Sequence, residues 1–508
     1  MRHPSRLGPW LEGRSRILRW GVPLLFGAFM ALGHEPFVAG WPVLVALVVF
    51  ALALPRSRRG AAVAGWLFGL GYFAVTLRWI VEPFLVDVAR HGWMAPFAIF
   101  LMAGGLALFW ALAAWGARAL AGPRPVAVLW LAVLMALAEL ARGHLFTGFP
   151  WGLPSYALIG SVWDVWFAWV GPYGLTFLVA AVACVTAYSL VRGWTLIWPA
   201  LVGVLFATMG LGALTPSAPD PTDQIVRVIQ PNAPQHLKWD RDWMGVFYNR
   251  ALDLTQAGEA ADVVVWPETS VPALVDTAGP LFVQMAEAAR GAPVVAGIQR
   301  AWQGAYYNSA VVLEGPTTVA DIYDKSHLVP FGEYIPFASV LRPLGLSVLV
   351  DQVAGFTPGA GQGLLDVDGL GRVRVLICYE GIFPEEISTG TDRPDVLLIL
   401  TNDAWFGQGP GPRQHLVQAR ARAIEQGVPV IRSANTGISA VIDARGAIVA
   451  DLALNEAGYL DAAVPRALPA TVYARIGDWP LAVLLGLCTL AGVATRRRFV
   501  VDGGQAGT

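Results

Sequence analysis

The sequence predicts a bundle of about eight transmembrane α-helices that carries a separate α/β domain. Hydrophobic residues make up 56% of the 508 residues and charged residues only 14%, with a mean hydropathy of +0.54. A water-soluble enzyme of this length is normally less apolar, so part of the chain is expected to lie in lipid. The apolar runs gather towards the two ends of the chain, and a more polar stretch, residues 215–478, lies between them.

The apolar runs predict seven helices before the polar stretch and one after it, because each is about long enough to cross a bilayer. The second and third runs are also compatible with one helical hairpin, so the count is approximate. We expect an N-terminal bundle (1–214), a polar domain (215–478), a C-terminal transmembrane helix (479–498) and a flexible cytoplasmic tail (499–508). The runs themselves cover residues 17–33, 41–55, 61–80, 93–120, 125–141, 165–191, 194–214 and 479–494.

The arginines predict the orientation of these helices, since basic residues gather at the cytoplasmic ends of membrane spans. If every run crosses the bilayer, the arginine-rich connections at residues 14–19, 56–59, 118–124 and 496–498 all fall on one side. We expect that side to be the cytoplasm. Residues 215–478 then face the periplasm from a bacterial inner membrane.

A secretory signal peptide is the alternative interpretation of residues 17–33, because basic residues precede this run. No persuasive small-x-small cleavage site precedes the sequence GHEPF, and the arginine alternation requires the first run to remain. We therefore expect a multi-pass membrane protein.

Charge and residue spacing argue against two further classes of partner. The formal charge is −1 and no basic block occurs, so nucleic-acid binding is not expected. The histidines are scattered without the spacing of metal ligands, so we expect no metal and no cofactor. Nothing in the sequence demands more than a monomer.

The polar domain alternates strand-like and helical patterns, which predicts a sheet-rich α/β fold. Helical patterns occur near residues 242–256, 280–289 and 413–425. Strand-like runs cover residues 225–230, 261–266, 293–298, 309–313, 373–377, 395–401, 429–433 and 438–443.

Three chemically complementary residues follow strand-like runs in this domain. Glu268 ends ADVVVWPET, Lys325 lies in YDKSHLVPFGEYIP, and Cys378 follows VRVLI. A carboxylate can deprotonate a thiol, an ammonium group can stabilise a thiolate and a developing oxyanion, and a thiolate can accept an acyl group. The three residues are therefore a candidate base, cation and nucleophile.

Each of the three also has a structural interpretation. Cys378 is the only cysteine outside the apolar runs, and a lone cysteine is more often a small buried side chain. Its position after a strand, before an IFPEEI segment that we expect to begin a helix, favours a thiolate instead. Glu268 could be a solvated loop carboxylate, and Glu333 could either orient Lys325 or anchor its own loop.

Lysine usage sharpens the interpretation of Lys325. Of 35 basic residues, only Lys238 and Lys325 are lysines. Arginine is thus the usual cation of this chain, and a compact ammonium group can donate to a small tetrahedral centre in a way that a planar guanidinium cannot. We expect Lys325 to act in chemistry rather than as a solvated surface charge.

These motifs resemble the nitrilase superfamily. The resemblance rests on WPE at Glu268, DKSHLVPFGEYIP at Lys325, CYE at Cys378, and the later TNDAWFG and RSANTGISA segments. The bracketing helices, with FTGFPW and GWLFGLGYF, resemble its membrane-bound branch, the apolipoprotein N-acyltransferase family. This resemblance covers almost the whole chain.

The resemblance implies an α-β-β-α sandwich on a bundle of eight transmembrane helices, and a two-step (ping-pong) reaction. In this family the cysteine takes an acyl chain from a membrane phospholipid as a thioester. It then passes the chain to the α-amino group of an S-diacylglyceryl-cysteine at an apolipoprotein N-terminus. By resemblance, Glu268 is the general base, Lys325 the electrostatic stabiliser and Cys378 the nucleophile. The matching supporting positions are Glu333, Tyr379, Glu380 and Trp239, the last on an arm over the site.

Two other functions remain open at this stage. A membrane-tethered amidase that hydrolyses a small periplasmic amide would use the same three residues, although one anchor helix would suffice for it. A transporter or scaffold with an inactive domain is less consistent with the intact set of residues. The apolar run 336–350 favours transfer if it forms a lid or an acyl-chain wall, but it could also simply pack over the domain.

Overall fold

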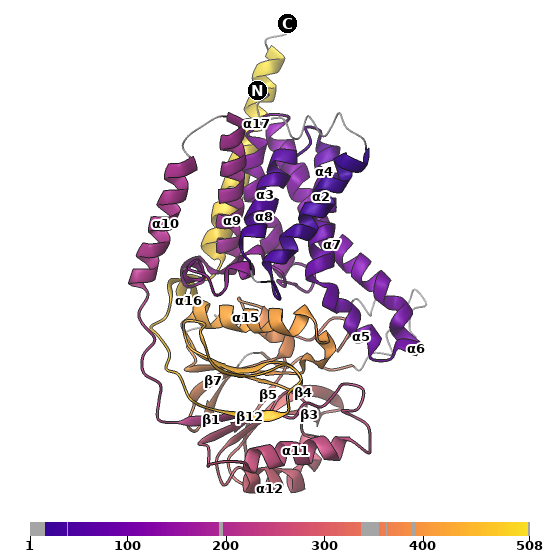
Figure 1. Cartoon of the computed structure of the whole chain (residues 1–508), viewed down its shortest axis with the longest axis vertical. Helices are drawn as coiled ribbons and strands as arrows, with labels where there is room; N and C mark the ends of the chain where they lie inside the picture. The colour runs from indigo at the N-terminus through magenta and orange to yellow at the C-terminus, as the bar shows by residue number, and fades with distance from the viewer. Residues whose placement is uncertain are drawn as a thin grey trace. The chain divides into compact units, whose positions relative to one another are not determined.

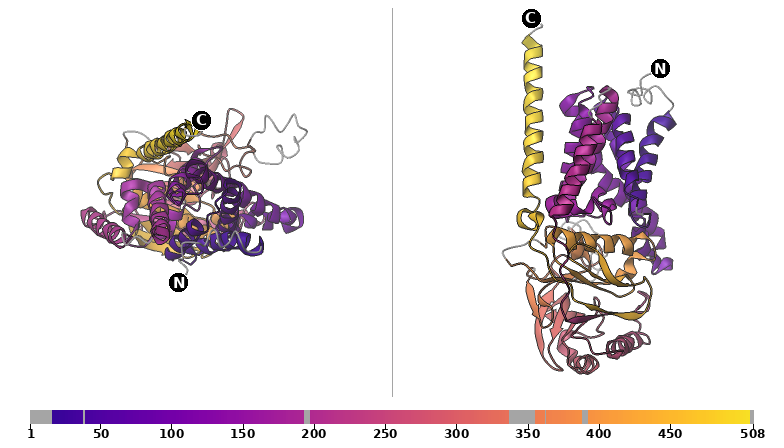
Figure 2. Two further views of the ribbon diagram at one scale, coloured as in Figure 1. Left: turned by 90° about the horizontal axis from the view of Figure 1, so that it is seen from above. Right: turned by 60° about the vertical axis from the view of Figure 1, so that its left-hand side comes forward.

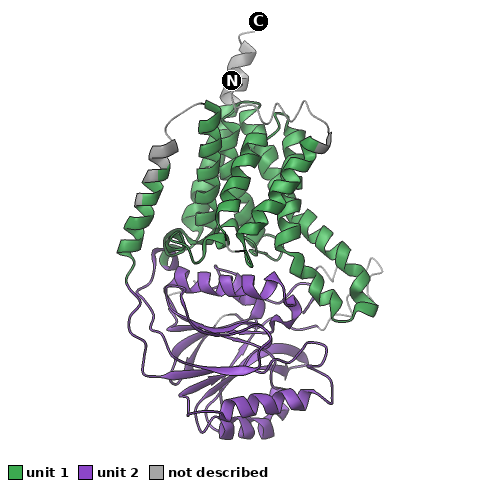
Figure 3. Cartoon of the chain, in the orientation of Figure 1, with its two compact units in different colours: residues 1–216, 475–508 green, residues 217–474 purple. Residues whose placement is uncertain are grey.

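The computed structural model describes residues 16–37, 39–192, 197–336, 355–361, 363–387 and 392–505 (Figure 1). The chain divides into two compact units (Figure 3). Unit 1 comprises Met1–Pro216 and Arg475–Thr508, and unit 2 comprises Ser217–Ala474. Except for Pro336, the run expected to form a lid lies outside the described residues.

Unit 1 is helical, and each of the eight apolar runs corresponds to one of its helices (Figures 1 and 2). Within the part of the chain that the structure describes, four segments are long and apolar enough to cross a membrane: Val88–Ala121, Ala127–His144, Asp164–Arg192 and Trp479–Arg496. One bent pair and three shorter apolar helices account for the other runs. The helices are α2 (Arg16–Met30), α3 (Trp41–Ala53), α4 (Arg58–Thr76), α7 (Ala95–Ala121), α8 (Ala127–His144), α9 (Phe167–Arg192), α10 (Ile197–Leu214) and α17 (Trp479–Gln505).

Two of these runs contain breaks that hydropathy alone does not reveal. The segment Arg78–Leu85 bends by 64° from α4. In α9 the backbone leaves the helical region at Gly171, where φ is 66°, immediately before Pro172. Glycine tolerates this conformation and proline lacks the N–H that would continue the hydrogen-bond ladder. Apolar composition therefore predicted where these segments lie but not that they are broken.

A buried ion pair lies on α8, at the spacing of one helical turn that predicts such a contact. Glu139 and Arg142 are 1% and 2% exposed, and Arg142 Nη2 pairs with Glu139 Oε2. Trp110 Nε1 donates to Glu139 Oε1 at 2.5 Å, and Arg142 Nη1 donates to the carbonyl groups of Phe149 and Trp151.

Unit 2 contains two six-stranded sheets with parallel centres and antiparallel edges. The first sheet has the order β12-β1-β2-β3-β4-β5, and the second has the order β11-β10-β9-β8-β7-β6. The strands of the first sheet are β1 (Ile225–Gln230), β2 (Val263–Val265), β3 (Val294–Trp302), β4 (Ala305–Leu313), β5 (Val319–Asp324) and β12 (Gly458–Ala463). Those of the second are β6 (Leu364–Val367), β7 (Gly371–Ile377), β8 (Val396–Thr401), β9 (Val430–Ala434), β10 (Ser439–Ile442) and β11 (Ile448–Leu452).

The two sheets face each other, and helices cover their outer faces, so the predicted α-β-β-α sandwich is confirmed (Figure 1). Side chains such as Val228 and Val375 meet in a core between the sheets. Alternate residues point outwards, where α11 (Met244–Gln256) and α12 (Gly279–Ala288) cover the first sheet and α15 (Pro410–Gln426) covers the second. The period of two along each strand thus supplies one apolar face to the centre and one to a helix layer.

Candidate active site

The candidate base, cation and nucleophile all follow strands, and the fold brings them together. Glu268 lies after β2, Lys325 directly follows β5, and Cys378 directly follows β7. Lys325 Nζ is 3.9 Å from Glu268 Oε1. The Cys378 thiol interacts electrostatically with both side chains. A carboxylate, an ammonium group and a thiol therefore share one site formed by both sheets of unit 2.

Lys325 is held between two carboxylates. Its side chain is 1% exposed, and Nζ lies 3.0 Å and 2.9 Å from the two carboxylate oxygens of Glu333. Burial opposes the charge of Lys325, but Glu333 and then Glu268 outweigh it and raise the pKa above its ordinary value. Lys325 is therefore a permanent cation here, as an electrostatic stabiliser must be.

Glu268 is fixed through both of its carboxylate oxygens. Asn308 Nδ2 donates to Oε1 at 2.8 Å, and the backbone N–H of Asn402 donates to Oε2 at 2.8 Å. Asn308 Nδ2 also lies 3.1 Å from Glu333 Oε1, so one amide group bridges both carboxylates. Each carboxylate oxygen has two lone pairs, which leaves Glu268 able to accept a proton.

Cys378 occupies an unusual backbone position. It is the first residue of a short 3₁₀-helix, η8 (Cys378–Ile382), and its φ is +53°, a left-handed conformation that costs free energy in a residue with a Cβ. The expectation that IFPEEI begins a helix is wrong, because η8 starts at the cysteine itself, Pro384 lies in a bend and Glu385, Glu386 and Ile387 form a turn. Prolines such as Pro384 cannot donate the N–H that a longer helix needs.

The resting state of Cys378 is a neutral thiol. Burial raises the pKa of the thiol, the Glu268 carboxylate raises it further, and Lys325 opposes both effects. The sequence favoured a thiolate, and this expectation is not met, because the pKa of the thiol lies above its ordinary value. A role as nucleophile would therefore require the thiol to lose its proton to a neighbouring base, and Glu268 is the carboxylate that acts on it most strongly.

Glu380 joins the two loops that carry Lys325 and Cys378. It is fully buried, and its Oε2 accepts from the N–H of Ile377 at 2.7 Å. Its Oε1 accepts from the N–H groups of Ser326 and His327, at 2.7 Å and 3.1 Å, and from the Tyr323 hydroxyl at 2.8 Å. These contacts fix the loop after β5 against the loop after β7.

The two aromatic candidates have different surroundings. Tyr379 is buried against the rings of His327 and Phe383, with centroids 5.4 Å and 5.0 Å away. Trp239 is 44% exposed and lies next to Lys238, whose Nζ is 5.9 Å from the centroid of its ring. Tyr379 is thus a buried packing residue next to Cys378, while Trp239 offers an exposed apolar surface next to Lys238.

Sequence reasoning missed a buried network behind Cys378. His415 Nδ1 lies 2.9 Å from Asp403 Oδ1, and Arg432 Nη2 lies 2.5 Å from Asp403 Oδ2. His415 also forms a hydrogen bond with the backbone of Cys378, so the network supports the left-handed nucleophile. Asp403 and Arg432 lie in the TNDAWFG and RSANTGISA segments, which signalled their importance without indicating a role.

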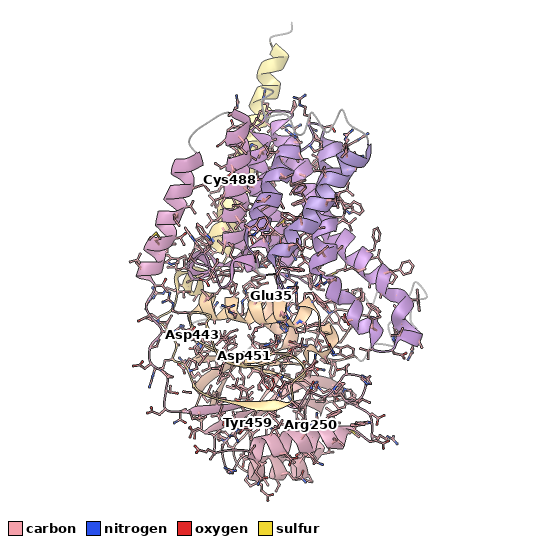
Figure 4. All side chains as sticks on the ribbon, viewed as in Figure 1. Glu35, Arg250, Asp443, Asp451, Tyr459 and Cys488 are labelled. Atoms are coloured by element: carbon pink, nitrogen blue, oxygen red, sulfur yellow. The ribbon has the colours of Figure 1, made fainter. Side chains whose placement is uncertain are left out.

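Asn308 and Lys238 were also missed as parts of the site. Asn308 directly precedes the strand-like run SAVVL, and a polar residue at this position is the one local signal of its function. The other two cysteines lie in unit 1, Cys184 on α9 and Cys488 on α17. Figure 4 labels Cys488. Within the described residues, no three His, Cys, Asp or Glu side chains gather in a way that could hold a metal ion.

Comparison with known proteins agrees with this fold. Residues 226–472 match the carbon-nitrogen hydrolase family, so unit 2 is a domain of the nitrilase class. Residues 26–185 match the N-terminal domain of apolipoprotein N-acyltransferases. A solved CN-hydrolase superfamily structure from Xanthomonas campestris covers 50% of this chain and 95% of that one, at 20% identity and a TM-score of 0.35, too low to inform the site.

Curated relatives match along nearly the whole chain. An apolipoprotein N-acyltransferase of Rhodopseudomonas palustris is 37% identical over 95% of this chain and 97% of its own. Those of Caulobacter vibrioides and Brucella suis are 39% and 38% identical, over 96% of this chain in both cases and 96% and 98% of theirs. The chain belongs to the apolipoprotein N-acyltransferase family.

Proposed function

We propose that this protein transfers a fatty acyl chain from a membrane phospholipid to the α-amino group of the N-terminal S-diacylglyceryl-cysteine of apolipoproteins. Membership of the family supports lipoprotein N-acylation. The observation that carries the mechanism is the buried cluster in which Lys325 Nζ lies 3.9 Å from Glu268 Oε1 and both side chains act on the Cys378 thiol.

The first half-reaction acylates Cys378. Glu268 takes the thiol proton as Sγ attacks the ester carbonyl carbon of the phospholipid. The Lys325 ammonium group stabilises the oxyanion of the tetrahedral intermediate. When the ester C–O bond breaks, Glu268 returns its proton to the departing alkoxide, which leaves a lysophospholipid and a thioester on Cys378.

The second half-reaction transfers the acyl chain to an amine. The neutral α-amino group of the apolipoprotein attacks the thioester carbonyl carbon, and the C–S bond breaks to release the Cys378 thiolate. Glu268 accepts the proton that the amine nitrogen loses and returns it to Sγ. The products are an amide and the free thiol, so Glu268 acts as the base in both half-reactions.

Burial of the cluster favours transfer over hydrolysis. Lys325, Cys378 and Glu268 are all at most 7% exposed. A thioester is useful for transfer only if water reaches it more slowly than the amine does. The amidase alternative requires neither several apolar helices nor a match to the N-terminal domain of apolipoprotein N-acyltransferases.

We further propose that the chain acts as a monomer in the bacterial inner membrane, with unit 1 in the bilayer and the catalytic domain in the periplasm. The arginines that flank the apolar runs support this orientation. An added cysteine at the exposed position Glu314 tests it. A membrane-impermeant thiol reagent should label Glu314→Cys in cells whose outer membrane has been removed, and labelling only after lysis would contradict the orientation.

The decisive test of the reaction is intact-protein mass spectrometry after incubation with phospholipid alone. The wild type should gain the mass of one fatty acyl chain, and hydroxylamine should remove it. Cys378→Ala should gain nothing while it keeps the thermal unfolding midpoint of the wild type. A folded wild type that forms no adduct would favour the amidase.

A further inference from the structure

The second lysine of the chain lies at the same site as the first. Lys238 is 7% exposed, on the segment between β1 and α11. Its Nζ donates to the backbone carbonyl of Glu268 and to Thr269 Oγ1, both at 3.0 Å. A chain that uses arginine almost everywhere else thus places both of its lysines against Glu268.

The turn that Lys238 contacts is a constrained one. Thr269 has a φ of +46°, which is unfavourable for a β-branched residue. The turn also packs against Gly297 of β3, where an added Cβ would lie 2.5 Å from Glu268 Cα. The backbone of Glu268 thus has little room on the Gly297 side. Any shift of this turn would also displace the Glu268 carboxylate, because the turn carries it.

Lys238 offsets negative charge around Glu268, where Glu333 and Glu380 add to the carboxylate of Glu268 itself. Lys325 and Lys238 supply two positive charges, and Glu333 and Glu268 supply two negative charges. Moving a proton from Cys378 to Glu268 relocates one negative charge and leaves the total unchanged. Without Lys238, the same transfer would occur in more negatively charged surroundings, where a thiolate is more costly.

We propose that Lys238 is a positioning residue for the acyl transfer proposed above, with its ammonium group holding the Glu268–Thr269 turn and supplying the positive charge that balances the thiolate. This inference rests on the proposed function. Lys238 does not touch the reacting atoms, so it acts through Glu268 and through its field at Cys378.

The ionisation of Lys238 gives this role a distinctive pH dependence. The titratable groups that face it are Glu268, from the turn after β2, and Cys378, from the turn after β7. His236 and Asp240 flank it along its own segment. Burial lowers the pKa of Lys238 to about 8, against the opposing effects of Glu268 and Cys378. The positive charge is therefore present below about pH 8 and lost above it.

The test is the single-turnover rate of thioester formation on the purified full chain, measured by mass spectrometry with phospholipid in mixed micelles. In the wild type the rate should fall as the pH rises from 7 to 9. Lys238→Met should be roughly 100-fold slower at pH 7 and should lack the fall centred near pH 8. Its unfolding midpoint should be no lower than that of the wild type, since a buried ammonium group has been removed.

Arg250 provides a matched control. It lies on α11 and donates to the carbonyl groups of Pro231 and Asn232, at 2.8 Å and 3.4 Å, without contacting Glu268 (Figure 4). Arg250→Met should keep the wild-type rate and pH profile. Thr269→Val, which removes only the hydroxyl acceptor, should slow acylation less than Lys238→Met and keep the fall near pH 8.

The outcomes separate this inference from the proposed function. If Lys238→Met acylates at the wild-type rate, or is slower but retains the fall near pH 8, the role proposed for Lys238 is wrong while the thioester mechanism stands. If the wild type forms no thioester at all, the proposed function itself fails.

Discussion

The ion pair on α8 and the cluster around Lys325 are both buried, yet their charges are used differently. Arg142 directs its donors to both Glu139 oxygens and to the carbonyl groups of Phe149 and Trp151. One cation meets one anion, and the remaining donors tie the chain after α8 to the helix. Such a closed set of contacts serves the fold.

The cluster in unit 2 has a surplus of acceptors beside a reactive group. Lys325 lies near two carboxylates, and a neutral thiol faces one of them. A proton can therefore move within this cluster, whereas the Arg142 that pairs with Glu139 keeps its proton. The comparison indicates that a buried charge serves catalysis when its neighbours can exchange a proton.

The largest effect should come from removing the base. Glu268→Gln keeps the shape of the side chain but cannot accept the thiol proton. We expect thioester formation to fall by about 10³-fold, within the usual range for a general base. The thermal unfolding midpoint should stay close to that of the wild type, and more than a tenth of wild-type activity would remove Glu268 from this role.

Breaking the pair on α8 should instead reduce stability. Arg142→Met leaves the Glu139 carboxylate buried without its cation, which should destabilise unit 1 by about 3–5 kcal/mol. The double variant Glu139→Leu, Arg142→Met should recover most of that loss, as judged by thermal unfolding in detergent. A large loss of acyl transfer in protein that remains folded would contradict a purely structural role for this pair.

The ionisation of Lys238 should make the protein more stable as the pH rises, whereas a lysine stabilised by an ion pair makes it less stable. Its pKa falls from 10.5 in the unfolded chain to about 8 in the fold, so its charge opposes folding at neutral pH. The unfolded state binds more protons between pH 8 and 10.5, and this contribution to stability therefore rises with pH over that window. Between pH 7 and pH 10.5 the wild type should therefore gain about 3 kcal/mol of stability relative to Lys238→Met, which lacks this ionisation. An equal difference in stability between the two proteins at both pH values would contradict the lowered pKa.

The smallest effect should follow from loosening the Glu380 contacts. Tyr323→Phe removes one of the donors to Glu380 Oε1 and leaves the backbone donors in place. We expect a loss of about 1 kcal/mol in stability and a change of less than about fivefold in thioester formation. Tyr306→Phe, at a position that is 53% exposed, is the control and should change neither measurement. A hundredfold loss in Tyr323→Phe alone would give Glu380 a direct part in the chemistry.

The strands missed by the sequence pattern share one property. β5, β6, β11 and β12 are the four edge strands of the two sheets. They are only partly buried, so they lack the continuous apolar runs that identify central strands such as β8. Hydropathy therefore predicts the centre of a sheet better than its edges.

By itself, the sequence determined which segments are apolar enough for lipid, where the central strands run, and which strand ends carry a carboxylate, an ammonium group and a thiol. These features are local, because each depends on a residue and its immediate neighbours. The tertiary structure alone decided the left-handed backbone at Cys378, the bridge made by Asn308 and the contact of Lys238 with Glu268. These depend on hydrogen bonds between residues far apart in the chain, and such contacts exist only once the sheets have brought their loops together.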